Sequence, residues 1–156
     1  MLLADLLARP ATAAAGGDPN RFLFARIIAS QASGNGCLPT RLGLPDEGYR
    51  RLVDAYFAGF ESPLPSAPTT ALPEWSDLQK LLVDHRAGER DSELTMADIV
   101  ATACAGADHL WQDLGLAARD ELTALMWVNF PALARANASD MKWKKFLYRQ
   151  FCSREG

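Results

Sequence analysis

The histidines of this chain are the first residues to consider for chemistry, and there are only two in 156 residues. His109 is flanked by Asp108 and, soon after, Asp113, and a carboxylate can orient an imidazole ring for metal ligation. His109 is therefore either a metal ligand or a core or helix-capping residue. His85 follows Asp84 near an expected helix end, where an imidazole commonly interacts only with the helix dipole. We expect a structural role for His85.

Catalytic motifs are absent from the sequence. It contains no glycine-rich phosphate loop, no His-Glu-x-x-His helix and no Gly-x-Ser-x-Gly elbow. No nucleophile stands beside a base that a third group could orient. We therefore predict that the protein is not an enzyme.

The three cysteines, Cys37, Cys104 and Cys152, are far apart and none has C-x2-C spacing. An odd number of dispersed cysteines argues against a disulfide framework and fits a reducing compartment. Cys104 lies at the edge of an apolar helical stripe and is expected to be a small buried thiol. Cys152 projects beside Lys145, and a neighbouring cation favours the thiolate. Cys152, His109 and Cys37 are the candidate metal ligands.

The last expected helix, 141–153, carries positive charge on one side. At about 100° per residue, Lys142, Lys145 and Arg149 line the side opposite the apolar stripe, and Lys144 lies outside this row. The whole chain has a formal net charge of −3, so the basic face is local. Such a face is either simply solvated or a site for an acidic partner or an oxyanion such as molybdate. The sequence leaves both interpretations open.

Helices must position these residues, because apolar residues recur at helical spacing and alternating strand patterns are nearly absent. We predict an all-α fold: one domain, 1–156, built as a compact irregular bundle of about six to seven helices. Residues 1–17 are expected to be a flexible or short helical amino-terminal segment, and 61–73, with its prolines, a surface loop. The expected helices cover 2–9, 19–33, 46–58, 74–86, the stripe 96–107, 121–129 and 141–153.

A shift of 72 positions aligns parts of the chain with each other. The most specific match is the corner Leu42-Gly43-Leu44 with Leu114-Gly115-Leu116. It indicates either an internal duplication of helical pairs or a chance agreement between amphipathic helices of similar composition. In this alignment Cys37 falls opposite His109.

The overall composition argues against several partners. A slightly negative net charge gives no reason to expect nucleic acid or an anionic membrane surface. No apolar run approaches the roughly 18 to 20 residues that a membrane span needs, and the amino terminus lacks the basic start of a secretory signal. We expect a cytoplasmic protein.

Two blocks in the last third of the chain have an unusual composition. The first is His109-Leu-Trp-Gln-Asp-Leu-Gly-Leu116, and the second is Asp140-Met-Lys-Trp-Lys-Lys-Phe146 with Tyr148-Arg149-Gln150 and Cys152. Together they closely resemble the NifQ family of nitrogen-fixation proteins. The resemblance is strong across 109–156 and looser over 42–82.

The resemblance implies a molybdenum-trafficking accessory protein that helps to build the iron-molybdenum cofactor of nitrogenase. It also implies that a molybdenum-iron-sulfur cluster is carried and passed to cofactor-assembly proteins, namely a NifEN-type scaffold and a NifH-type reductase. The alternative is a module that docks a partner or binds molybdate without a cluster of its own.

The family's cluster motif, C-x4-C-x2-C-x5-C after the final basic helix, does not occur in this sequence. Thiolates are the usual ligands of iron-sulfur clusters, and three dispersed cysteines are a poor substitute for four close ones. The chain is either a truncated form or a degenerate relative, and we favour truncation. We expect no cluster on this chain.

Overall fold

The computed structural model describes residues 2–61 and 72–155, and within them the chain is all-α, with ten helices and no strand. The predicted fold class is confirmed. The expected number of helices was too low because α2, α7 and α9 have only four to six residues, too few to show a helical period. The helices are α1 (Leu2–Ala8), α2 (Ala13–Gly16), α3 (Asn20–Ala32), α4 (Asp46–Tyr56), α5 (Trp75–Asp84), α6 (Ser92–Ala103), α7 (Leu110–Leu114), α8 (Arg119–Asn129), α9 (Pro131–Ala136) and α10 (Trp143–Glu155).

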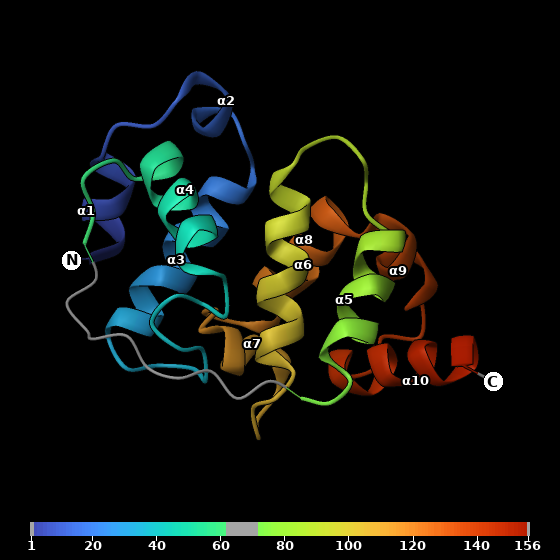
Figure 1. Ribbon diagram of the computed structural model, residues 1–156. Coiled ribbons are helices and arrows are strands. Elements are labelled where there is room, and N and C mark those ends of the chain that lie inside the picture. The colour runs from blue at the N-terminus through green and yellow to red at the C-terminus, as the bar shows by residue number, and fades with distance from the viewer. Residues whose placement is uncertain (1, 62–71, 156) are drawn as a thin grey trace.

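Helix α6 is the centre of the fold. In Figure 1, α1, α3 and α4 lie on one side of it, and α5, α9 and α10 lie on the other. Its predicted apolar stripe, Met96, Ile99, Val100 and Ala103, is completely buried. Each large side chain of this kind contributes about 1.5 to 3 kcal/mol when it is removed from water. One continuous apolar core therefore joins both sides of the molecule.

Two details differ from the sequence prediction. Helix α10 begins at Trp143, not at Met141, because the Asn137 side chain accepts a hydrogen bond from the Met141 backbone N–H (2.9 Å) and donates one to its carbonyl oxygen (3.1 Å). Within 1–17, expected to be a flexible or short helical segment, α2 forms a second short helix beyond the one expected at 2–9, because the Thr12 side chain caps it by accepting from the Ala15 N–H (3.1 Å). Most of the expected proline-rich loop, 62–71, lies outside the described residues.

The helices of residues 2–57 match those of residues 75–130 in order and spacing. At a shift of 72 or 73 positions α1 corresponds to α5, α3 to α6 and α4 to α8. Helix α1 packs on α3 as α5 packs on α6. Both α4 and α8 have 11 residues and end at a buried phenylalanine, Phe57 (φ −144°, ψ 61°) and Phe130 (φ −135°, ψ 60°). We refer to these ranges as the first and second halves.

Contacts between the two halves are reciprocal at the Leu-Gly-Leu corners. The Ser30 hydroxyl donates to the carbonyl oxygen of Gly115 (2.5 Å), and a side chain at Gly115 would overlap Ser30. Gly43 and Thr102 are the counterparts of Gly115 and Ser30. They are equally close, since a side chain at Gly43 would overlap Thr102. When residue i contacts j and the counterpart of j contacts the counterpart of i, the arrangement is that of a twofold axis.

A second reciprocal pair lies at the start of α3 and α6. Asn20 Nδ2 donates to Asn129 Oδ1 (2.7 Å). The counterpart of Asn20 is Ser92 and the counterpart of Asn129 is Tyr56, and these two side chains are also hydrogen-bonded. Asn20 and Ser92 contact each other directly, with 2.9 Å between Nδ2 and Oγ. Chance agreement between two helices does not produce paired contacts of this kind. The structure therefore favours the internal duplication.

None of the described helices combines the length and the apolar character that crossing a bilayer requires.

Candidate functional site

A cleft of about 380 Å³ lies where the start of α10 meets α7 and α8. Four of its ten lining residues are basic and one is acidic, so its charge is opposite to the −3 of the whole chain. The two sequence blocks of unusual composition, which begin at His109 and at Asp140, meet here although they are about thirty positions apart. The lining residues are Asp108, His109, Leu110, Trp111, Arg119, Leu122, Lys142, Trp143, Lys144 and Lys145.

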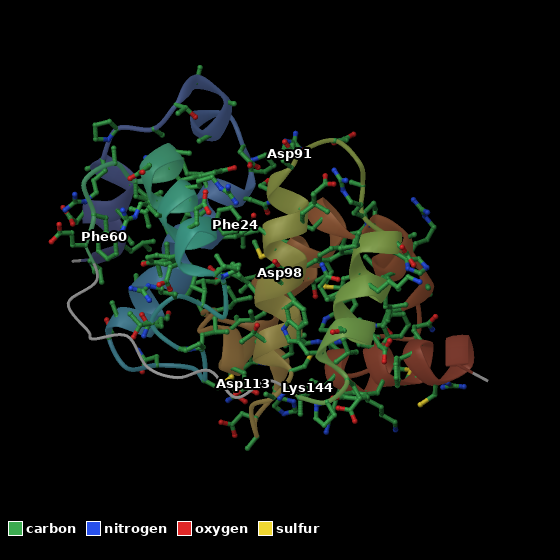
Figure 2. All side chains as sticks on the ribbon, viewed as in Figure 1. Phe24, Phe60, Asp91, Asp98, Asp113 and Lys144 are labelled. Atoms are coloured by element: carbon green, nitrogen blue, oxygen red, sulfur yellow. The ribbon has the colours of Figure 1, made fainter. Side chains whose placement is uncertain are left out.

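Lys144 is turned inward and holds the cleft together. Its Nζ donates to the carboxylate of Asp113 and to the carbonyl oxygens of Gly106 (2.7 Å) and Asp108 (2.6 Å). An ammonium group has three donors, so all of them are used. Figure 2 shows Asp113 and Lys144 side by side at the end of the molecule where α7 and α10 meet. Lys144 was expected among the anion-binding or partner-binding residues. In the structure its ammonium group is paired with the Asp113 carboxylate.

Asp113 is the buried partner in this ion pair, with 3% of its surface exposed. Its carboxylate also accepts the Asp108 N–H (3.2 Å), and its carbonyl oxygen accepts the Cys37 N–H (2.9 Å). Gly106 passes so close that any side chain there would overlap the carboxylate. Asp113 therefore fixes the loop before α7, the loop after α3 and the start of α10 in one arrangement.

Two other lysines of the cleft are not tied down. Lys142 and Lys145 are exposed, and within the described part of the chain no hydrogen bond or ion pair is recorded for either ammonium group. Arg119, in contrast, pairs with Asp140 (3.0 Å) and donates to the Met141 carbonyl oxygen (2.8 Å). After these pairings, the free charges in the cleft are two ammonium groups and the Asp108 carboxylate.

Trp143, the first residue of α10, also lines the cleft. Its side chain is 5% exposed, and its ring meets the Phe146 ring edge to face at 5.8 Å. The indole N–H has no acceptor among the described residues. A buried donor without an acceptor costs roughly 1 to 3 kcal/mol, which an acceptor brought to the indole would recover.

The cysteines are separated by position and environment. Cys104 is buried, as predicted, and burial raises the pKa of its thiol to about 12. Burial, with the nearby Asp113 carboxylate, also raises the pKa of the Cys37 thiol, which donates to the Ala103 carbonyl oxygen (3.5 Å). Both thiols are thus protonated at neutral pH. Cys152 is exposed near the far end of α10, roughly 14 Å along the helix from Trp143.

The candidate metal ligands do not come together. His109 is exposed at the start of α7, where its backbone N–H donates to Gln112 Oε1 (3.2 Å), whereas Cys37 lines a neighbouring cleft beside Asp113. Across residues 2–61 and 72–155, no group of three or more His, Cys, Asp or Glu side chains is placed to hold a metal ion. These residues do not fit an iron-sulfur cluster, which needs close thiolates.

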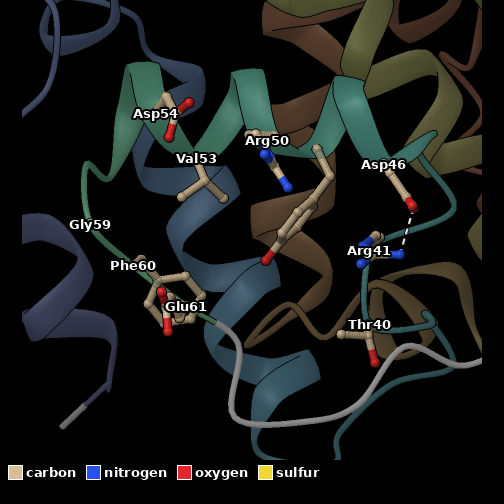
Figure 3. A pocket seen from close by; sticks show the side chains of 10 residues that line it. Thr40, Arg41, Asp46, Arg50, Val53, Asp54, Gly59, Phe60 and Glu61 are labelled. Atoms are coloured by element: carbon tan, nitrogen blue, oxygen red, sulfur yellow. Dashed lines mark hydrogen bonds and ion pairs between the residues drawn. The ribbon is translucent and has the colours of Figure 1, made fainter.

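A second cleft, of about 640 Å³, lies over α4 in the first half. Figure 3 shows that its wall carries both signs of charge, with Arg41 paired to Asp46 at 2.5 Å. Arg50, Asp54 and Glu61 also line this cleft. The lining holds two basic and three acidic side chains, so the cleft has no positive excess with which to attract an anion.

Sequence reasoning found the lysines of the basic cleft but missed Asp113 and the role of Trp143. The bond between Asp113 and Lys144 joins residues 31 positions apart, and no local spacing reveals it. Trp143 was assigned to the apolar stripe, correctly, but its unpaired N–H becomes visible only when its neighbours are known. Arg149, the third residue of the expected basic face, is exposed but lies outside the cleft.

Comparison with known proteins gives consistent matches. A family model described as NifQ matches residues 23–156. Protein NifQ of Azotobacter vinelandii is 40% identical over 153 residues, which cover 88% of this chain and 78% of the relative. Protein NifQ of Rhodobacter capsulatus is 38% identical over 134 residues (85% and 74%), and that of Klebsiella pneumoniae is 36% identical over 128 residues (77% and 76%). No solved structure matches the chain.

Proposed function

The chain belongs to the NifQ family, and on this premise we propose that it is a molybdenum-trafficking accessory protein in the assembly of the iron-molybdenum cofactor of nitrogenase. The observation that carries the proposal is the family match over 23–156, which includes every residue of the basic cleft. Its partners are then the cofactor-assembly proteins, a NifEN-type scaffold and a NifH-type reductase. The three free thiols suit a reducing cytoplasm.

A carrier role, as opposed to catalysis, is supported by the state of the nucleophilic groups. The Cys37 and Cys104 thiols have raised pKa values and are poor nucleophiles at neutral pH. His109 lies at the start of α7, and no nucleophile is recorded beside it within residues 2–61 and 72–155. A protein that binds and hands over its cargo needs neither a nucleophile nor a base.

The test is the molybdenum content of nitrogenase made in a nitrogen-fixing bacterium that lacks its own NifQ protein. With molybdate limiting, supplying this chain should restore molybdenum in the purified nitrogenase. A matched strain receives a variant with Lys142, Lys145 and Trp143 replaced by Gln, Gln and Phe. If the chain accumulates in folded form and nitrogenase still lacks molybdenum, the proposal is wrong.

The iron-sulfur cluster of the family is a separate question, because the described residues do not fit one. We propose that this chain takes up no stoichiometric cluster. The measurement is iron and molybdenum per chain after anaerobic reconstitution with iron, sulfide and molybdate. A full cluster per chain would contradict the proposal and would require Cys37, Cys104 and Cys152 to meet.

A second candidate function is the docking of an acidic partner on the basic face of α10. Lys142, Lys145 and Arg149 are all exposed, which favours it. Replacing these three residues by Glu should abolish binding to the assembly proteins in a pull-down. The matched control replaces three other exposed basic residues by Glu, namely Arg50 and Arg51 on α4 and Lys80 on α5. Binding should persist in this variant. Equal loss in both variants would show a general charge effect and no docking face.

A further inference from the structure

We propose that the cleft between α7 and α10 binds a tetrahedral oxyanion, with the Trp143 indole N–H and the ammonium groups of Lys142 and Lys145 as donors. This inference deepens the proposed function, on which it rests only for the choice of molybdate as the natural ligand. Sulfate and tungstate have the same shape and charge as molybdate, so the site should accept them too.

The unpaired Trp143 N–H is the first support. Three buried side-chain nitrogens lack a partner in the described part of the chain: the indole nitrogen of Trp143 and the Nε atoms of Arg9 and Arg26. Both arginines form hydrogen bonds through their other nitrogens, with Ala58 and Glu121. Trp143 has only one donor, so its whole hydrogen-bonding capacity is unused.

The distribution of charge is the second support. Lys144 and Arg119 are neutralised by Asp113 and Asp140, so they contribute structure and little attraction. Lys142 and Lys145 flank Trp143 and Lys144 and have free ammonium groups beside the cleft. The Asp108 carboxylate also lines the cleft and opposes an anion. Two free cations against one carboxylate still leave an excess of positive charge.

The start of α10 adds a third contribution. This helix has 13 residues, and its first-turn N–H groups, beginning at Trp143, have no partner within the helix. Such groups and the positive end of the helix dipole favour an anion. Because Lys144 anchors this first turn to Gly106, Asp108 and Asp113, the donors are held in place before a ligand arrives.

The decisive measurement is the indole N–H resonance of Trp143 in a nitrogen-15 NMR titration of the unmodified chain with sodium molybdate. The chain has four tryptophans, and two are internal controls: the Trp75 indole already donates to Thr102 (3.0 Å), and Trp127 is exposed and is not among the residues that line the cleft. We expect a saturable shift at Trp143 and none at Trp75 or Trp127. No shift at Trp143, or equal shifts at all tryptophans, would overturn the proposal.

Calorimetric titrations of variants measure the contribution of each donor. Trp143→Phe keeps the ring and removes the N–H, and molybdate affinity should fall about tenfold, the effect of one hydrogen bond to a charged group. Lys142→Gln and Lys145→Gln should each weaken binding to a similar extent. Lys80→Gln on α5 removes the same charge at an exposed residue outside the cleft lining and should leave affinity within about twofold. A Trp143→Phe affinity equal to that of the unmodified chain would contradict the role of the indole.

The two proposals can fail separately. If nitrogenase gains molybdenum through this chain but molybdate does not shift the Trp143 indole resonance, the proposal of an oxyanion site is wrong and the carrier role stands. If molybdate and sulfate both saturate the site while nitrogenase gains no molybdenum, the site is real and the carrier role is wrong.

Discussion

The two Leu-Gly-Leu corners have the same place in the duplicated fold but different chemistry. In the first half, Arg41 lies on the surface and pairs with Asp46. In the second half the position of Arg41 is taken by Asp113, which is buried under Lys144. Lys144 comes from α10, which has no counterpart in the first half. The repeated helices thus supply the same scaffold twice, and the added helix turns one corner into a candidate site.

The largest expected difference between the corners is in stability. Lys144→Met leaves the Asp113 carboxylate buried and without its ammonium partner, which should lower the free energy of unfolding by about 3 to 5 kcal/mol. Arg41→Met removes an exposed ion pair and should cost at most about 1 kcal/mol. Urea denaturation followed by circular dichroism measures both.

The neighbours of Lys144 are the controls for this prediction. Lys142→Met and Lys145→Met change the same residue type on the same helix, but both side chains are exposed. Their effect on the free energy of unfolding should stay within about 0.5 kcal/mol. A loss from Lys144→Met that is no larger than the loss from Lys145→Met would show that the corners do not differ in this way.

A smaller effect tests what the corners have in common. Gly43 and Gly115 both have a left-handed backbone, with φ of 83° and 80°, and in both a side chain would meet the opposite half. Gly43→Ala and Gly115→Ala should each lose about 2 to 4 kcal/mol of unfolding free energy, from backbone strain and overlap together. Thermal or urea unfolding of the two variants should give losses within about 1 kcal/mol of each other. Loss in only one variant would contradict the reciprocal contacts.

The smallest predicted difference depends on pH and concerns the loops before α3 and α6. Arg21 donates to the carbonyl oxygens of Leu7 (3.3 Å) and Arg9 (2.9 Å). Its counterpart Glu93 is 1% exposed and accepts the N–H groups of Gly88 (2.7 Å), Glu89 and Arg90, together with the side chain of Arg86. One position therefore binds backbone carbonyl oxygens in the first half and loop N–H groups in the second.

Burial alone would raise the pKa of Glu93, but the Arg86 side chain and the three loop N–H groups lower it below its ordinary value. A lowered pKa stabilises the folded chain while the group is ionised. This contribution should be complete above about pH 5, because the unfolded pKa is about 4.3, and should be lost as the pH falls through the folded pKa.

Hydrogen exchange should show this loss as faster exchange of the Gly88, Glu89 and Arg90 amides in acid. Glu93→Gln should remove the acid sensitivity and cost about 1.5 to 3 kcal/mol at neutral pH. Arg21 holds the loop before α3 through hydrogen bonds to carbonyl oxygens and without a carboxylate, so hydrogen exchange in that loop is the control. If that loop loosens together with the Gly88 loop, Glu93 is not the cause.

Much of the fold could be predicted from the sequence because helical periodicity is a local signal. The buried stripes of α6, α8 and α10 follow directly from the spacing of residues such as Ile99, Leu125 and Phe146. The duplication could be recognised as one alternative because Gly43 and Gly115 stand in the same Leu-Gly-Leu sequence in both halves. The short helices and the late start of α10 depend on side-chain caps at Thr12 and Asn137, which periodicity does not record.

The site was less predictable because its bonds join distant parts of the chain. The exposure of Lys142 and Lys145 agrees with the basic face, but Lys144, adjacent to both in sequence, serves a different purpose. Nothing in the sequence around Lys144 shows that its partner is the buried Asp113. The unused Trp143 donor is a property of its surroundings and so depends on the complete fold.

The reciprocal contacts between the halves have the form of a homodimer interface that lies within a single polypeptide. In a homodimer of identical subunits every substitution occurs twice, so Arg21 could not face one loop while Glu93 faced the other. The same holds for Arg41 and Asp113. Joining the two copies in one gene product removes that constraint, because each copy can mutate alone. The covalent link thereby permits one asymmetric binding place per molecule where a symmetric dimer would have to carry two or none.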